Sequence, residues 1–484
     1  MNKKIHIVGI CGVATSALAI AFHKKGWTVT GSDKGFYPPV STALEQAGIP
    51  FYAGWHPEKM GTPDFVVIGT ASGTQNPETV FAHEHNIPIK SDAEVRGEYF
   101  AKKHSIVCAG TWGKTSSTAL LAHILTEAGM DPSYVIGGLP TSSSADLDKP
   151  FPAARLGDSD WSVIEGDEYK SSPTDNRPKF AYLHATHLLL TAVSWDHADL
   201  YPTEASYFKV FEKLIAEIPA GGLIVACNDH EKVMEMIKKN RPAPRISYGK
   251  KNADYVYENI SQSADGLRFT ITHKNKKKDG QENSYNITSP MIGVYQAENI
   301  TGCFALACEI GIPPEKAAQA ISSFKGLKRR LEKRLDGKVT IFDDIAHSPE
   351  KAASVLANVR SIYQGRITAI FEPNIGGRQK EAIAKYDSAF KDADLVIIPR
   401  LTKLKINQDA DADADAEKQP LEGDELAAYI SKTHPSVTYI DDDKVLVKKI
   451  AKTAKTGDVI VFLGSHGFRG MIEETIQEIQ KLKK

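Results

Sequence analysis

The chain has 484 residues, and at about one domain per 150 residues this length predicts roughly three domains. Its 59 Lys and Arg residues balance 60 Asp and Glu residues, so the net charge of -1 favours neither a nucleic acid nor a membrane surface as a partner. The five cysteines are scattered and show no CxxC spacing. This usage is typical of reduced thiols in a cytosol and argues against a disulfide framework or a zinc site, so we expect all five cysteines to be packing residues.

The N-terminal segment begins with Lys3-Lys4 and a largely apolar run, a combination that also starts a secretory signal peptide. Polar and glycine residues, including His6, Gly9 and Gly12, interrupt this run. We therefore predict a short strand over 5–9, a glycine turn and an amphipathic helix in place of a signal peptide. No other stretch of the sequence approaches the length of a membrane-spanning helix.

Residues 1–104 alternate strand-like and helix-like segments, and we assign them to a first domain. The segments are KIHIVGI, then a helix, WTVTGSD, the helical STALEQAG, and FVVIGTA. Alternation of this kind predicts an α/β fold with a parallel sheet that is covered on both faces.

Residues 105–327 form the predicted central domain. Its strands at SVIEGD, THLLLTAV and GGLIVACND are followed by apparently antiparallel β segments between Ile246 and Ile292, with the polar HKNKKKDGQEN as a hairpin tip. Two predicted helices, Gln296–Ile310 and Pro314–Phe324, complete this domain.

Residues 328–484 alternate strands and helices again and form a third predicted α/β domain. The basic stretch KGLKRRLEKRLDG joins it to the central domain, and GLKRR is the predicted hinge. The tract Asp409–Glu417 repeats Asp and Ala, and its like charges predict a solvated loop in preference to a metal site.

The stretch VCAGTWGKTSS places a glycine-rich loop between an apolar strand and a helix. The phosphate-loop pattern GxxxxGK[ST] lacks its first glycine here, because Cys108 stands at that position. The remaining AGTWGKT is a shorter form of the same phosphate-binding loop. Lys114 would reach the β- and γ-phosphates of a nucleotide, and Thr115 would ligate Mg²⁺. The amides of Gly110–Gly113 would hold phosphate oxygens.

Carboxylates and a histidine follow two later strands, in SVIEGDEY and TAVSWDHADLY. Each cluster alone is typical of a solvated strand end. Together with the phosphate loop they predict a two-metal site for phosphoryl transfer. The residues concerned are Glu165, Asp167, Glu168, Asp196, His197 and Asp199.

The first glycine turn, GICGVATSA, has Gly9 and Gly12 but Ala14 at the third glycine position, and Asp33 ends the second strand. This is a partial match to the dinucleotide fingerprint of a Rossmann fold, in which the acidic residue binds a ribose hydroxyl. Two nucleotide sites on two domains require one reaction that uses both.

With these motifs the sequence resembles the Mur ligases of peptidoglycan assembly, from its first strand to its last. The resemblance is carried by HIVGICG, GSDKGFYPPVSTALEQAGI, AGTWGKT, VIGG, EGDEYKSSPTDNRPKF, WDHADLY, GLKRRLEKR, FDDIAHSP and GFRGM. Within the family the chain looks most like the murein peptide ligases, which join L-Ala-γ-D-Glu-meso-diaminopimelate to UDP-N-acetylmuramate. The block YPPVSTALEQAGI and the stretch DNRPKF favour this activity, and addition of L-alanine to the same nucleotide is the alternative.

The resemblance implies the three-domain Mur ligase architecture. In it a Rossmann-like N-terminal domain binds the UDP-sugar, a P-loop ATPase-like central domain binds ATP, and an α/β C-terminal domain receives the amine. It also implies ATP and Mg²⁺ as cofactors and small molecules as the only partners, with no nucleic acid and no membrane, and we expect a cytoplasmic monomer. The γ-phosphoryl group would pass to the lactyl carboxylate, and the amine would attack the resulting acyl phosphate.

Carried over residue by residue, the resemblance implies a catalytic role for Lys114, Glu165 and His197 and metal ligation by Thr115, Glu165 and His197. The implied ATP-binding residues are Gly110, Thr111, Gly113, Lys114, Thr115, Ser116, Gln296, Asn299, Arg330, Asp344 and His347. The implied UDP-sugar-binding residues are Gly9, Gly12, Ser32 and Asp33.

The chain departs from the family's pattern at several positions. Tyr295-Gln296 replaces the usual His-Asn, Ser194 replaces a glutamate before WDH, and Trp112 is unusual in the phosphate loop. Asn374 stands where the tripeptide enzymes show an arginine, and the sequence leaves open whether Arg378 replaces it. These changes leave the implied metal ligands intact and bear on recognition of the amine.

Two other classes of protein are compatible with parts of the sequence. An NAD(P)-dependent oxidoreductase would use the first glycine turn, but it leaves the phosphate loop, Glu165 and His197 without a purpose. A binding or regulatory protein that keeps the ligase fold without turnover would account for the departures.

Overall fold

The computed structural model describes residues 3–36, 40–69, 73–141, 151–197, 199–240, 243–275, 281–402 and 420–481. The predicted Asp409–Glu417 loop and the end of the predicted hairpin, 276–280, lie outside these residues. Among the described helices, none combines the length and apolar character that a membrane crossing requires.

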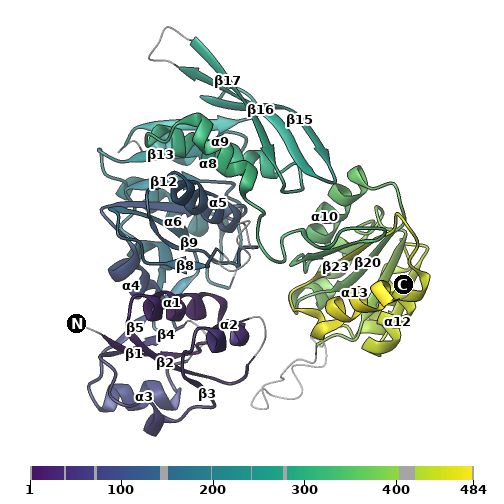
Figure 1. Cartoon of the computed structure of the whole chain (residues 1–484), viewed down its shortest axis with the longest axis horizontal. Coiled ribbons are helices and arrows are strands. Elements are labelled where there is room, and N and C mark those ends of the chain that lie inside the picture. The colour runs from purple at the N-terminus through teal and green to yellow at the C-terminus, as the bar shows by residue number, and fades with distance from the viewer. Residues whose placement is uncertain are drawn as a thin grey trace. The chain divides into compact units, whose positions relative to one another are not determined.

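The chain divides into two compact units (Figure 1). The first comprises Met1–Ser261, Leu267–Met291 and Tyr295–Leu327, and the second comprises Gln262–Gly266, Ile292–Val294 and Lys328–Lys484. The predicted first and central domains thus share one unit, and the ranges 1–104, 105–327 and 328–484 stay predictions.

The N-terminal part of the first unit is a parallel sheet of the order β3-β2-β1-β4-β5. Its strands are β1 (Lys4–Val8), β2 (Thr28–Asp33), β3 (Phe51–Ala53), β4 (Phe65–Ile68) and β5 (Ile89–Ser91), and its helices are α1 (Val13–Lys24), α2 (Val40–Gln46) and α3 (Pro77–Glu84). The inner strand β4, which lies between β1 and β5, is buried along its whole length, as expected for a parallel strand between two layers of helices. The N-terminal segment is therefore a strand, a glycine turn and a helix, as predicted.

The central part of the first unit is built on a sheet of the order β17-β16-β15-β14-β13-β12-β6-β9-β7-β8. Its strands are β6 (His104–Ala109), β7 (Ser133–Val135), β8 (Ala154–Arg155), β9 (Trp161–Gly166), β12 (His187–Leu190), β13 (Leu223–Cys227), β14 (Arg245–Gly249), β15 (Tyr255–Ser263), β16 (Gly266–Asn275) and β17 (Gln281–Ser289). Its main helices are α5 (Lys114–Glu127), α6 (Glu204–Glu217), α7 (Glu231–Lys239), α8 (Gln296–Glu309) and α9 (Pro314–Ser323). A short helix, α4 (Asp92–Val95), leads into this part, and β10 (Lys170–Ser172) and β11 (Asp175–Pro178) form a separate hairpin.

The strands between Ile246 and Ile292 differ from the antiparallel arrangement predicted for them. β14 pairs parallel with β13, and β15 pairs parallel with β14. Within this segment β16 and β17 do form an antiparallel pair, at the teal edge of the sheet in Figure 1. The prediction failed for β14 because strand direction depends on which distant strand becomes the neighbour, and local residue pattern does not encode that choice.

The second unit contains a sheet of the order β18-β19-β23-β20-β21-β22, in which β18 alone is antiparallel to its neighbour. Its strands are β18 (Glu332–Leu335), β19 (Thr340–Asp344), β20 (Ile367–Glu372), β21 (Leu395–Pro399), β22 (Val437–Ile440) and β23 (Val459–Gly464). Its helices are α10 (Pro349–Ile362), α11 (Gly423–Ile430), α12 (Asp443–Thr453) and α13 (Met471–Lys481). The α/β class predicted from the sequence is confirmed in both units.

Candidate active site

The glycine-rich loop follows β6, which lies in the interior of the central sheet between β9 and β12. Two of its glycines have backbone conformations and surroundings that exclude a side chain. Gly110 has a φ of 140°, and a Cβ there would lie 2.1 Å from the hydroxyl of Thr191. Gly113 has a φ of 85°, and a Cβ there would lie 2.3 Å from Oδ1 of Asn299. The loop can therefore approach its neighbours this closely only because both residues are glycine.

The loop is fastened to the residues that follow β12. The Thr111 amide donates to the Ala192 carbonyl at 2.7 Å, and the Trp112 amide points to the same oxygen at 3.4 Å. The Thr111 hydroxyl donates to the Ser194 carbonyl, and the Thr191 hydroxyl donates to the Trp112 carbonyl at 2.6 Å. The sequence predicted that the Thr111 amide holds a phosphate oxygen. In the structure this amide instead donates to the Ala192 carbonyl.

The N-terminus of α5 supplies other backbone amides that could bind phosphate. The first intrahelical bond joins the Ser117 amide to the Gly113 carbonyl at 2.9 Å. The amides of Lys114, Thr115 and Ser116 precede that bond and therefore have no acceptor within the helix. Such an end binds anions well because its donors and the helix dipole point the same way.

Lys114 forms a nearly buried ion pair with Glu168. Its ammonium lies 3.0 Å from Oε2 of Glu168 and also donates to the Gly110 carbonyl at 3.0 Å. Burial alone would lower the pKa of Lys114, but the carboxylates of Glu168 and Glu165 outweigh burial and raise it. The lysine therefore carries a positive charge beside the loop, as a phosphate-binding lysine must.

Glu165 ends β9 and is held by two donors. The Thr115 hydroxyl donates to its Oε1 at 3.0 Å, and the Gly137 amide donates to its Oε2 at 2.8 Å. A Cβ on Gly137 would lie 2.5 Å from both carboxylate oxygens, so the glycine is what allows the backbone to approach. The structure thus brings together Thr115 and Glu165, two of the predicted metal ligands.

His197 contacts Glu168, a carboxylate that the resemblance does not include among the metal ligands. Its Nε2 lies 3.6 Å from Oε1 of Glu168, and its backbone has a φ of 54°. The hydrogen bond with Glu168 raises the pKa of His197, while burial opposes the rise and Asp196 adds to it. Metal ligation by His197, which the resemblance implies, stays a prediction.

The donor set around Thr115 suits one Mg²⁺ ion. A hydroxyl and a carboxylate are the hard oxygen ligands that Mg²⁺ prefers, and such ions usually keep several waters beside one or two carboxylates. Oε2 of the buried Glu168 has no hydrogen-bond partner among the described residues, although the Lys114 ammonium is close to it. Thr115 and Glu165 could hold the ion directly, with Glu168 next to them.

Glu168 is the central residue that the sequence analysis placed only among several strand-end carboxylates. It is 1% exposed, and it also accepts a hydrogen bond from the Tyr207 hydroxyl at 3.2 Å. The sequence EGDEY does not distinguish Glu165, Asp167 and Glu168 as partners for Lys114. The fold shows that Glu168 forms the ion pair. Asp167 instead pairs with Lys179 at 3.1 Å.

Two of the predicted ATP-binding residues, Gln296 and Asn299, lie at the start of α8. Asn299 is 7% exposed, its Oδ1 faces Gly113, and its Nδ2 donates to the Gln296 side chain at 3.3 Å. These two residues therefore stand at the phosphate loop, in the same unit as Lys114.

A cavity of about 840 Å³ opens at the first glycine turn. Gly9, Gly12 and Asp33 line it, and Asp33 accepts a hydrogen bond from the Cys11 amide at 2.9 Å. Ser32, also predicted to bind the UDP-sugar, is fully buried and donates to Glu78 without lining this cavity. Two lysines missed by the sequence analysis, Lys34 and Lys179, do line it. The fold alone brings Lys179 here, since it comes from the central part of the chain.

Three predicted ATP-binding residues belong to the second unit. Arg330 is exposed. Asp344 is buried, and its two oxygens accept from the amides of Leu331 and Ala346 at 2.7 and 2.8 Å. The Nδ1 of His347 lies 2.7 Å from the Ile345 carbonyl. The carboxylate of Asp344 thus orders the chain around Arg330.

Arg378, the suggested replacement for the arginine missing at Asn374, is occupied inside the second unit. It is 3% exposed, and its guanidinium donates to the carbonyls of Leu421 and Thr402 and to the carboxylate of Glu422. A guanidinium bound this way fastens a chain segment and offers little to a substrate carboxylate.

Three family profiles match consecutive parts of the chain. The Mur ligase family catalytic domain matches residues 4–104, the Mur ligase middle domain matches 108–307, and the Mur ligase glutamate ligase domain matches 329–466. Among curated proteins, the chain is 32% identical over 472 residues to UDP-N-acetylmuramate–L-alanine ligase of Novosphingobium aromaticivorans, covering 95% of this chain and 94% of that protein.

Solved structures of similar proteins cover the whole chain. One is UDP-N-acetylmuramate–alanine ligase from Thermotoga maritima, with a TM-score of 0.79, 21% identity and coverage of 100% of this chain and 99% of that one. Another is a murein peptide ligase from Psychrobacter arcticus, with a TM-score of 0.71, 26% identity and 99% coverage of both chains. The curated relatives thus carry the activity that the sequence analysis gave as its alternative, and the tripeptide activity is represented among the structural neighbours.

Proposed function

The chain belongs to the Mur ligase family, and on that premise we propose that it joins the lactyl carboxylate of UDP-N-acetylmuramate to an amine at the expense of ATP. Members of this family are ATP-dependent amide-bond ligases of peptidoglycan synthesis, which decides against the oxidoreductase considered from the first glycine turn.

One observation carries the proposal. The loop between β6 and α5 places Lys114 and Thr115 against Glu168 and Glu165, two nearly buried carboxylates at and just beyond the end of β9. A cation, a hydroxyl and free helix amides that face two acids are the parts from which phosphoryl-transfer sites are built. Glu165 and Thr115 would hold Mg²⁺, which when bound would neutralise charge on the phosphates.

The cavity at the first glycine turn is our proposed site for the UDP-sugar. Its volume falls in the range of about 300–1,000 Å³ that small-molecule sites occupy. Lys34 and Lys179 line it and could meet a diphosphate, while Gly9 and Gly12 let the backbone come close. Asp33 keeps its proposed contact with the ribose.

In the proposed reaction, the lactyl carboxylate attacks the γ-phosphorus of ATP, the bond to the β–γ bridging oxygen breaks, and ADP leaves. The resulting acyl phosphate has a good leaving group, so the amine can add to its carbonyl and expel inorganic phosphate. Lys114 and the amides at the start of α5 stabilise charge on the transferred group. His197, held by Glu168, is placed to accept a proton, since histidine changes charge near neutral pH.

We propose L-alanine as the first candidate for the amine. The curated relatives that cover 95% of this chain at 28% to 32% identity are L-alanine ligases, and Arg378 is not free to replace the arginine of the tripeptide enzymes. The tripeptide is the second candidate, favoured by YPPVSTALEQAGI, by DNRPKF and by the 26% identity to a murein peptide ligase.

A paired assay separates the candidates. The purified full chain is incubated with UDP-N-acetylmuramate, Mg²⁺ and ATP, with either L-alanine or L-Ala-γ-D-Glu-meso-diaminopimelate, and phosphate release and product mass are followed. Product with L-alanine alone supports the first candidate, and product with the tripeptide alone supports the second. Absence of product with both amines, from protein that binds ATP, would favour a family member without turnover.

The cytoplasmic location and the monomeric state expected from the sequence stay predictions. ATP and a UDP-sugar are substrates that a cytoplasmic enzyme can reach, which supports the location. Light scattering of the purified chain would test the monomer.

A further inference from the structure

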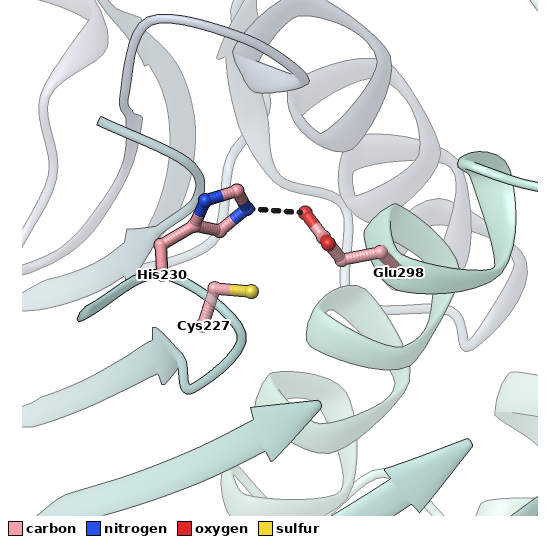
Figure 2. Close-up of side chains that lie close together, drawn as sticks. All are labelled: Cys227, His230 and Glu298. Carbon is pink, nitrogen blue, oxygen red and sulfur yellow. Dashed lines mark ion pairs between the residues drawn. The ribbon is translucent and has the colours of Figure 1, made fainter. Parts of the chain in front are cut away.

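A cysteine, a histidine and a glutamate meet in the first unit, at the end of β13 and the starts of α7 and α8. Cys227 ends β13, His230 directly precedes α7, and Glu298 lies in the first turn of α8. One ligand atom from each side chain lies within 4.8 Å of the other two, and no second cluster of this kind occurs in the part of the chain that the structure describes. Figure 2 shows the sulfur of Cys227 and the ring of His230 directed toward the Glu298 carboxylate.

The spacing of these atoms is close to that of a metal site. Nε2 of His230 lies 3.5 Å from Oε1 of Glu298. Zinc bonds of about 2.0–2.3 Å in a tetrahedron separate neighbouring ligand atoms by roughly 3.5 Å. The side chains of His230 and Glu298 are 32% and 21% exposed, so small rotations can bring both to a metal while Cys227 stays fixed at its buried strand end.

The buried hydroxyl of Tyr248 belongs to the surroundings of the cluster. Tyr248 is 0% exposed, and its hydroxyl has no hydrogen-bond partner among the described residues. Tyr248 is the register partner of Cys227 on the neighbouring strand β14, so the two side chains lie on the same face of the sheet. A thiolate accepts a hydrogen bond better than a thiol does, and metal ligands commonly receive such bonds from neighbouring side chains.

The chemistry of the three ligands selects the ion. A thiolate and an imidazole favour zinc over the hard cation Mg²⁺, and a carboxylate can complete the set. We propose that Cys227, His230 and Glu298 bind one Zn²⁺ ion, with a fourth position open to water. Cys227 would then be a ligand, in contrast to the packing role that the sequence predicted for every cysteine.

The proposed ion lies beside the nucleotide site proposed above. Glu298 precedes Asn299 in α8, and Asn299 reaches Gly113 of the phosphate loop. Metal binding would therefore fix the first turn of α8 at the residue next to Asn299, a predicted ATP-binding residue. The zinc site itself does not depend on the identity of the ligase substrates.

Cobalt substitution tests the site directly, because a cobalt–thiolate bond absorbs in the near ultraviolet. The full chain is stripped with a chelator, kept reduced and free of nucleotide, and titrated with Co²⁺. We expect a charge-transfer band that saturates at one equivalent and disappears when Zn²⁺ is added. Cys227→Ser should abolish the band, and His230→Gln should weaken Co²⁺ binding by at least about tenfold.

The matched control is Cys308→Ser, which removes a half-buried thiol at the far end of α8 and should keep the band. His230 is about one-third exposed, so its variant tests the site even if Cys227→Ser does not fold. A wild-type chain without a thiolate band, a band that survives Cys227→Ser, or Co²⁺ affinity unchanged in His230→Gln would overturn the proposal.

Discussion

The Lys114 ammonium lies 3.0 Å from the carboxylate of Glu168, which is only 1% exposed. His197 and Tyr207 approach the other oxygen of that carboxylate at 3.6 and 3.2 Å. One acid thus organises the lysine of the phosphate loop and a histidine from beyond the next strand. The charges of Lys114 and Glu168 are interdependent, because removal of either side chain leaves the other charge nearly buried without its partner at 3.0 Å.

Lys114→Met should reduce ligation about 10²- to 10³-fold, since a charge that stabilises the transferred phosphoryl group is lost. It should also lower the free energy of unfolding, because Glu168 loses its cationic partner. Adding Glu168→Gln should recover part of that stability without restoring turnover. Phosphate release and urea unfolding measure the two effects, and Lys213→Met, at a lysine 70% exposed on α6, is the control. Full activity in Lys114→Met would refute the assigned role.

His197→Asn tests the contact with Glu168 through its pH dependence. The hydrogen bond to Glu168 raises the pKa of His197 in the folded chain. The stabilisation is therefore complete below the ordinary histidine pKa of about 6.5 and is lost as the pH rises through the raised folded value. Asparagine tolerates the positive φ at this position. The difference in unfolding free energy between wild type and variant should be larger at pH of about 6 than at pH of about 9; equal differences would contradict the pairing.

Glu78→Gln tests the buried hydrogen-bond network around Glu78, which follows Asn76 and Pro77 of the proposed UDP-sugar cavity. Burial raises the pKa of Glu78, but hydrogen bonds from His6, Ser32, the His56 amide and Tyr52 outweigh burial and leave it below the usual value. The ionised carboxylate therefore stabilises the fold above the ordinary glutamate pKa of about 4.3, and this is lost as the pH falls through the lowered folded value. We expect a loss of about 1–3 kcal/mol at neutral pH by urea unfolding. A neutral-pH loss within error of zero would show that the network tolerates an amide.

Gly137→Ala should damage the metal site without touching a ligand. The added methyl would lie 2.5 Å from both oxygens of Glu165, so the carboxylate must move away from Thr115. We expect the Mg²⁺ concentration for half-maximal activity to rise about 10- to 100-fold, as for other changes that disturb a ligand's support. Gly221→Ala, where no atom lies within 4 Å of the added carbon, is the control. An unchanged Mg²⁺ requirement would remove Glu165 from the proposed metal site.

Much of the fold follows from local pattern. The alternation of strands and helices and the glycine loops after β1 and β6 are visible in the sequence, and the predicted helices beginning at Gln296 and Pro314 agree closely with α8 and α9. The parallel pairing of β14 and β15 was not visible, because their neighbours are chosen by packing across the whole sheet.

The site was predicted less completely, for a physical reason. The sequence identifies Lys114, Thr115 and Glu165, but the importance of Glu168, which follows β9, depends on burial against Tyr207 of the distant helix α6. The cluster of Cys227, His230 and Glu298 likewise depends on the meeting of β13 and α8. Hydrophobic periodicity reports local secondary structure, so it does not predict contacts between side chains that are distant in the sequence.

The carbonyl of Ala192 receives the Thr111 amide, so the chain after β12 shapes the loop before any ligand arrives. The conformational entropy of the loop is therefore lost when the protein folds, and a nucleotide that binds there meets an already rigid surface. Association at such a surface should be fast and should change the local backbone little. Variants that remove the Thr111 or Thr191 hydroxyl would then slow nucleotide association and make the phosphate loop more flexible. Neither side chain needs to contact the nucleotide for this effect.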